Sequence, residues 1–204
     1  VLYLDGERLR RAENLWQQIR VKISRNMERV QHCQRFQANQ QAQTMREIEQ
    51  RLLITFHIEE LMDVLAEELP RVNIQECYLA LYEDPQPYHY PQSAPTWSRL
   101  VLAYNESGRI PLPSSGQRFR SNRILPDPLL CRDTPYALDV WPLYFRETQL
   151  GFIVFDIRPS HSRSIYNALR KQISNALQGA LLVQQIEAHD AELTRKQYIL
   201  DSFM

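Results

Sequence analysis

The sequence has 204 residues, with 24 Lys+Arg balanced by 24 Asp+Glu. Zero net charge argues against non-specific binding of nucleic acid, and 24% charged residues without a long apolar run argue against insertion in a membrane. Three cysteines, Cys33, Cys77 and Cys131, form no closely spaced pair, which favours a reducing compartment without a disulfide framework.

Proline and glycine divide the chain into helical ends and a non-helical middle. All twelve prolines lie between Pro70 and Pro159, and residues 7–69 contain neither proline nor glycine. Proline breaks helix interiors and glycine weakens them. We therefore expect long helices at both ends, with strands and loops between them. Helices this long extend beyond a compact domain and need a partner.

The first helix carries the spacing of a coiled coil. Trp16, Ile19, Ile23, Asn26, Val30 and Cys33 follow one another at alternating steps of three and four. Residues 1–54 carry a net charge of +4, which also allows an arm that binds nucleic acid. Because Glu13 and Glu28 interrupt the basic residues, we favour a solvated coiled-coil surface and expect no nucleic acid partner.

A second amphipathic helix follows a break. The apolar stripe changes phase near Thr55, which predicts a kink at 55–57 and a helix that ends before Pro70 and packs on a sheet. Strand-like runs occur at 77–82, 99–104, 137–145 and 149–157, the last two as a hairpin, with a further edge strand at 117–120. We expect loops at 84–97 and 105–136 and a final helix after Pro159. This order predicts an α+β fold with an antiparallel sheet.

The residues that catalysis or metal binding needs are not grouped in this sequence. Five glycines at scattered positions leave no phosphate-binding loop, and the five histidines show no ligand spacing. Cys131 stands beside Arg132, whose charge favours the thiolate, so it is a candidate redox site against the alternative of an inert surface thiol. We expect no catalytic residues, no metal and no cofactor.

Residues from about Leu53 to Gln185 resemble a GAF domain. The resemblance rests on "ITFHIEELMDVLAEELPRVNI" entering "CYLALYED", and on "VWPLYFRETQLGFIVFDI" leading into "YNALRKQISNALQGALLVQQIE". It implies about six antiparallel strands, helices on one face, and a small-molecule pocket under loops on the other. This version is similar to GAF domains between helical linkers in bacterial sensor histidine kinases. The residues that bind cyclic nucleotides or bilins in other GAF domains are not seen here.

These observations give a domain plan and a function. We expect a coiled-coil linker at 1–54, a GAF-like sensory domain at 55–185, and a helical linker at 186–204 leading toward a PAS or kinase domain. The chain starts at Val1 without Met or a signal-peptide pattern, so we expect a cytoplasmic piece of a longer two-component kinase. The piece itself is expected to relay a signal, not to be an enzyme. The alternative is a structural connector without a ligand.

A parallel homodimer is the expected assembly, because both terminal helices are too long for the domain to cover. Its expected interface residues are Trp16, Ile19, Ile23, Val30, Ile48, Leu52, Ile173, Ala176, Ala180 and Val183.

Any ligand is expected between the long loops and the sheet. On the first strand, either Tyr78, Ala80 and Tyr82 or Leu79 and Leu81 face that side, and the tyrosines suit a pocket wall better. The hairpin offers Trp141, Leu143 and Phe145 or the alternate set, a choice that stays open. Arg120 and Arg123 in the roofing segment favour a small anionic ligand. The alternative is that both arginines are solvated. The expected ligand contacts are Tyr78, Tyr82, Arg120 and Arg123.

Overall fold

The computed structural model describes residues 6–89, 91, 95–130, 136–157 and 163–201. Its helices are α1 (Gly6–Leu53), α2 (Ile58–Glu68), the 3-10 helix η1 (Leu69–Val72), α3 (Asp127–Leu130) and α4 (Arg163–Asp201). Its strands are β1 (Cys77–Pro87), β2 (Trp97–Asn105), β3 (Gly108–Arg109), β4 (Gln117–Arg120), β5 (Leu138–Phe145) and β6 (Thr148–Asp156). The chain divides into two compact units, 1–44 and 45–204, which are described separately.

The first unit contains most of α1. This helix runs for 48 residues, as the long stretch without glycine or proline predicted. It ends at Leu53, and α2 begins after His57, so the predicted break at 55–57 is confirmed. The second unit begins at Met45, inside α1, because the last turns of this helix pack into the domain core.

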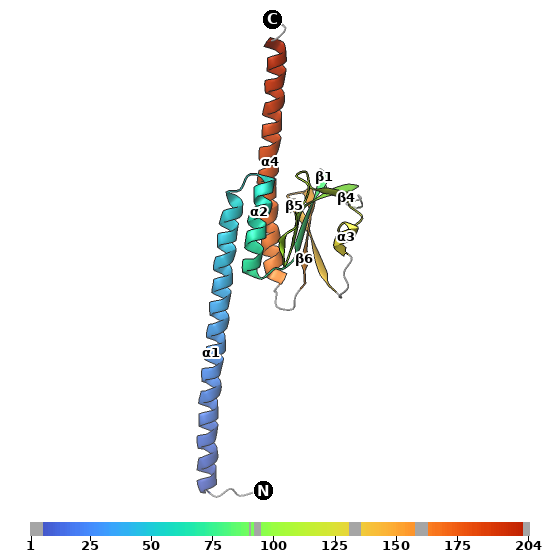
Figure 1. Ribbon diagram of the computed structural model, residues 1–204. Coiled ribbons are helices and arrows are strands. Elements are labelled where there is room, and N and C mark those ends of the chain that lie inside the picture. The colour runs from blue at the N-terminus through green and yellow to red at the C-terminus, as the bar shows by residue number, and fades with distance from the viewer. Residues whose placement is uncertain (1–5, 90, 92–94, 131–135, 158–162, 202–204) are drawn as a thin grey trace. The chain divides into compact units, whose positions relative to one another are not determined.

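A six-stranded antiparallel sheet forms the centre of the second unit. The strand order is β3-β2-β1-β6-β5. The edge of β2 that faces away from β1 pairs with two short strands, with β4 near its start at Trp97 and with β3 near its end at Asn105. Figure 1 shows α2 and α4 on one side of this sheet and α3 on the other. The α+β class and the antiparallel sheet are therefore confirmed.

The strands differ from the prediction in both expected loops, because β3 lies within 105–136 and β1 extends into 84–97. β1 continues to Pro87, whereas a loop was expected from residue 84, because Gln86 and Pro87 pair with Gln149 and Thr148 of β6. This end of β1 pairs on one side only, so prolines that cannot donate to a ladder are tolerated there.

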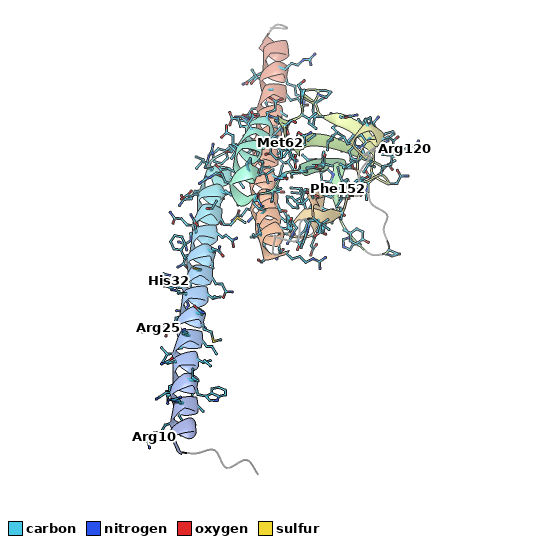
Figure 2. All side chains as sticks on the ribbon, turned by 60° about the horizontal axis from the view of Figure 1, so that its bottom comes forward. Arg10, Arg25, His32, Met62, Arg120 and Phe152 are labelled. Atoms are coloured by element: carbon cyan, nitrogen blue, oxygen red, sulfur yellow. The ribbon has the colours of Figure 1, made fainter. Side chains whose placement is uncertain are left out.

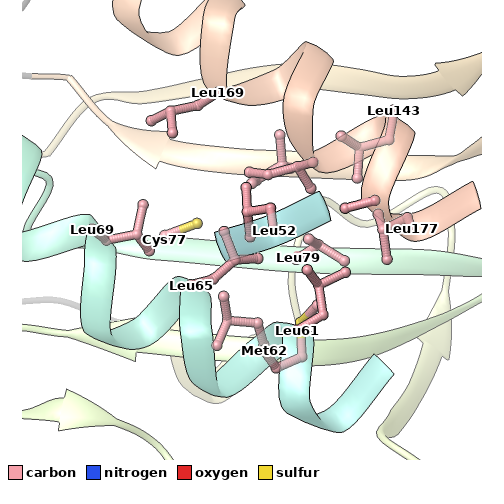
Figure 3. Close-up of a cluster of buried hydrophobic side chains, with 14 of the residues drawn as sticks. Leu52, Leu61, Met62, Leu65, Leu69, Cys77, Leu79, Leu143, Leu169 and Leu177 are labelled. Carbon is pink, nitrogen blue, oxygen red and sulfur yellow. The ribbon is translucent and has the colours of Figure 1, made fainter. Parts of the chain in front are cut away.

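The main core lies between the sheet and the helices. Figure 3 shows Leu52 from the end of α1, Leu65 from α2 and Leu177 from α4 converging on Leu79 of β1. All four side chains are at most 1% exposed. The end of α1 is therefore part of the same core as α4.

This packing corrects half of the predicted dimer interface. Ile48, Leu52, Ile173, Ala176 and Ala180 are buried within the chain, none more than 5% exposed. Helices that cover a sheet turn their apolar stripe toward it, so this stripe has little surface left for a partner.

Charged residues fix the end of α1 to α2 and η1. The side chain of Glu68 is only 2% exposed and accepts hydrogen bonds from Arg51 and, at 2.6 Å, from Arg71. Arg51 also binds Glu67 at 2.7 Å, and Arg71 binds Glu47 at 2.5 Å. We call these five residues the Glu68 cluster. The cluster joins the end of α1 to α2 and η1, with 16 to 24 residues of sequence between the paired side chains.

Candidate functional site

The sheet face away from α2 and α4 holds the tyrosines predicted to bind a ligand. Tyr78, Ala80 and Tyr82 lie on this loop-side face, whereas Leu79 and Leu81 belong to the helix-side core. On the hairpin, Leu143 is fully buried in the helix-side core, and Trp141 and Phe145 pack against it. The structure thus settles both alternation choices that the sequence left open.

Side chains of the domain itself fill the loop-side face. The ring centroids of Tyr82 and Phe152 lie 6.1 Å apart, and those of Phe119 and Phe152 lie 6.4 Å apart. Leu125, in the segment that crosses this face, is fully buried in the same cluster. The phenol of Tyr82 is removed from water, which raises its pKa. We call this group the loop-side cluster: Tyr78, Ala80, Tyr82, Leu100, Ala103, Phe119, Leu125, Phe152 and Val154.

The structure does not bring the predicted arginines to the tyrosines. Arg120 neighbours Phe119 on β4 and therefore points to the opposite sheet face, where its guanidinium lies 5.5 Å from the ring centroid of Trp97. Arg123 follows β4 and forms an ion pair with Asp127, one helical turn later. Figure 2 labels Arg120 at the outer side of the sheet region and Phe152 nearer to its middle.

A charged group lies beside Arg120 on the helix side of the sheet. Arg99 and Arg118 both donate to the carboxylate of Glu83, each at 2.9 Å, and Arg118 lies 4.0 Å over the ring of Trp97. The hydrogen bond from Arg118 is the main reason that the pKa of Glu83 is lowered, and the bond from Arg99 lowers it further. Glu83 therefore stays ionised, and each of its two arginines already has a carboxylate partner.

Two neighbouring hollows, which share lining residues and together are called the groove, open on the helix side near the start of α2. The larger has a volume of about 750 Å³, an apolar floor of Leu81, Val101 and Leu150, and Phe56 and Gln184 at its walls. The smaller, of about 420 Å³, shares Val101 and extends toward Arg109. The sequence did not predict this groove, because residues distant in sequence form it.

Both long helices expose apolar side chains. On α1, the predicted seam residues Trp16, Ile19, Ile23 and Val30 are 66%, 48%, 55% and 55% exposed. On α4, the exposed stripe consists of Leu182, Ile186 and Leu193, not the stripe chosen from the sequence. Their separations of four and seven residues place them on one helix face, but this spacing alone does not indicate whether that face is buried or exposed.

The cysteines differ in exposure. Cys77 is buried in the helix-side core, which raises the pKa of its thiol, and Cys33 is exposed on α1. Cys131, the predicted redox site, lies outside the described residues.

Within the described residues, the side chains give no sign of a metal centre and the helices give no sign of a membrane span. No group of three His, Cys, Asp or Glu side chains there is arranged to hold a metal ion. None of the helices there combines the length and the apolar character that crossing a lipid bilayer requires.

Comparison with known proteins gives similarity to solved structures alone. No protein-family model matches the chain, and no curated protein matches it. It is similar to the GAF domain from Acinetobacter phosphoenolpyruvate-protein phosphotransferase, at 14% identity and a TM-score of 0.48, over 71% of this chain and 97% of that one. It is also similar to residues 122 to 287 of a methyl-accepting chemotaxis protein, at 13% identity, a TM-score of 0.45, and 69% and 99% coverage. A phycoerythrobilin-bound GAF domain from a cyanobacterial phytochrome gives 14% identity, a TM-score of 0.43, and 71% and 97% coverage.

Proposed function

We propose that this chain is a dimeric signal-relay module, in which a GAF-like domain couples α1 to α4. The observation that carries the proposal is that both long helices enter one core. Ile48 and Leu52 of α1 and Leu169, Ile173 and Leu177 of α4 are buried in the same apolar cluster. Close-packed cores tolerate few arrangements, so displacing one helix end changes the packing available to the other.

The exposed seam of α1 supports the dimer. Four large apolar side chains at heptad spacing stand about half exposed on a single chain, and a second copy provides a matching seam. The seam also contains Asn26, and a buried polar pair of this kind fixes the register of a parallel coil.

The surrounding protein in this proposal is a cytoplasmic sensor histidine kinase of a two-component system. The sequence resemblance to GAF domains and the six-stranded sheet that it implied support this assignment. The catalytic kinase domains belong to the rest of the parent protein, and this chain supplies sensing and relay.

Cys33 offers a direct test, because it occupies a seam position and is exposed. In a parallel dimer, mild oxidation should link the two Cys33 thiols and clamp α1. Hydrogen exchange of α4 amides in 182–197 should then change relative to the reduced protein, with Cys33→Ser as the control. A chain that sediments as a monomer at micromolar concentration contradicts the dimer, and unchanged exchange in a linked dimer contradicts the relay.

The second candidate is a structural connector without a ligand, and the loop-side cluster favours it. A ligand at Tyr78 and Tyr82 must displace Phe119 or Phe152, both only 7% exposed. The sensing form of the proposal takes a small molecule there, and the expected anionic ligand would bind without Arg120, which lies over Trp97, and with Arg123 already paired to Asp127. Thermal shift against a panel of carboxylates and phosphates separates the two, since a ligand at 100 times its Kd adds about 2.7 kcal/mol. A shift that persists in Tyr82→Ala places the ligand elsewhere.

A further inference from the structure

The outer face of α4 carries an apolar stripe that the described chain leaves uncovered. Leu182, Ile186 and Leu193 are 51%, 53% and 50% exposed. At about 100° per residue, they lie on the side opposite the buried Ile173 and Leu177. The stripe therefore has a role other than packing the domain core.

Gly179 lies beside the start of this stripe, in the interior of a helix of 39 residues. A Cβ at this position meets no atom within 4 Å, so packing within the chain does not require glycine. Glycine is the least favourable residue in a helix interior after proline. On an outward face, it allows a second helix backbone to approach closely.

The stripe also has the spacing of a helix pair. Gly179, Leu182, Ile186, His189 and Leu193 follow at alternating steps of three and four. A parallel pair in register opposes each of these residues to its own copy.

The flanking residues are compatible with that pair. Parallel pairing places Gln185 of one copy beside Asp190 of the other, and Glu192 beside Gln197, so each carboxylate meets an amide. Glu192 also forms an ion pair with Lys196 of its own helix at 2.7 Å.

An antiparallel pair fits this stripe less well. The outward face before Gly179 is polar, with Lys171 and Asn175 exposed. Pairing Leu182 with Ile186 in antiparallel fashion sets Leu193 against Asn175. It also runs the exposed end of one helix along the domain of the other copy.

We infer that the outward stripe of α4 is the docking surface for the α4 stripe of a second copy, parallel and in register. This inference rests on the dimer of the proposed function. The contact between the two α4 helices then lies at Gly179, Leu182, Ile186 and Leu193 and not at the buried face that contains Ile173. The two helix backbones approach each other most closely at Gly179.

Cysteine crosslinking of the full chain tests the arrangement, in a Cys33→Ser, Cys131→Ser background. Leu182→Cys and Ile186→Cys place thiols on the stripe, and Gln184→Cys and Glu187→Cys are matched controls on the groove side of the helix. We expect each stripe variant to form crosslinked dimer about tenfold faster than the controls, because disulfides need closely placed Cβ atoms. Equal rates overturn the inference. Faster linking in a mixture of Leu182→Cys with Ile186→Cys than in either alone also overturns it, because this result indicates an antiparallel pair.

A second variant tests the close approach. Gly179→Ile should weaken dimerisation about tenfold in sedimentation while helical content stays unchanged, since a Cβ at this position meets no atom of its own domain within 4 Å. Unchanged dimerisation overturns the role of Gly179. If the chain is dimeric but the α4 cysteines link no faster than the controls, this inference fails while the proposed function stands on α1. A monomer refutes both.

Discussion

Replacing Glu68 by Gln should detach the end of α1 from the domain. The substitution keeps the size of the side chain and removes the charge that binds Arg51 and Arg71. Breaking a buried ion pair commonly costs about 3–5 kcal/mol, because a charge remains buried without a partner. Here the two arginines are 44% and 43% exposed and keep Glu67 and Glu47 as partners, so the remaining charges stay hydrated and paired.

We therefore expect a loss of about 2 kcal/mol, near the value for hydrogen bonds to charged groups. For a unit of this size, this loss lowers the melting temperature by about 4–8 °C. Urea unfolding followed by circular dichroism measures the free energy of unfolding. Hydrogen exchange of the amides of residues 45–53 measures the detachment of α1 directly.

Glu67→Gln is the matched control, because it removes a partner of the same Arg51 at an exposed position. Exposed ion pairs contribute about 0–1 kcal/mol, so this variant should remain close to the parent protein. The reasoning is refuted if the two variants lose the same free energy, or if the amides of 45–53 exchange no faster in Glu68→Gln.

Three further predictions concern single residues. A Cβ at Gly151 would lie 2.0 Å from the carbonyl oxygen of Ala80. Gly151→Ala should therefore cost about 3 kcal/mol in urea unfolding, the upper end of the usual range for overpacked sites. A loss below about 1 kcal/mol contradicts the packing of β6 on β1. The arginine partners of Glu83 lower its pKa. The stability that this ion pair adds is therefore complete at pH values above the ordinary carboxyl pKa and is lost as the pH falls through the lowered pKa of the folded protein. In Glu83→Gln, the free energy of unfolding should fall less steeply with decreasing pH, and an unchanged pH dependence shows that the pair adds no stability. Burial raises the pKa of the Cys77 thiol, whereas Cys33 is exposed. A thiol reagent at neutral pH should therefore label Cys33 rapidly and Cys77 only after unfolding. Rapid labelling of Cys77 in the native protein would show that this residue is not buried.

The sequence by itself determined the long helices, the main strands and their order. The absence of glycine and proline in 7–53 specified α1, and the phase change at Thr55 specified where α2 begins, because both signals act through local backbone geometry. The hairpin of β5 and β6 was likewise predicted within a residue or two of its observed ends.

Only the tertiary structure decided which faces are inside. Ile48 and Ile173 belong to apolar stripes that suit a partner helix or a domain core equally well, and periodicity cannot distinguish the two. The loop-side cluster likewise depends on Phe119, Leu125 and Phe152 meeting from separate segments. Helix and strand patterns follow from neighbours along the chain, whereas burial follows from contacts between segments far apart in sequence. The positions of Leu182 and Leu193 on the exposed side of α4 could therefore be assigned only once the opposite side was seen to pack on the sheet.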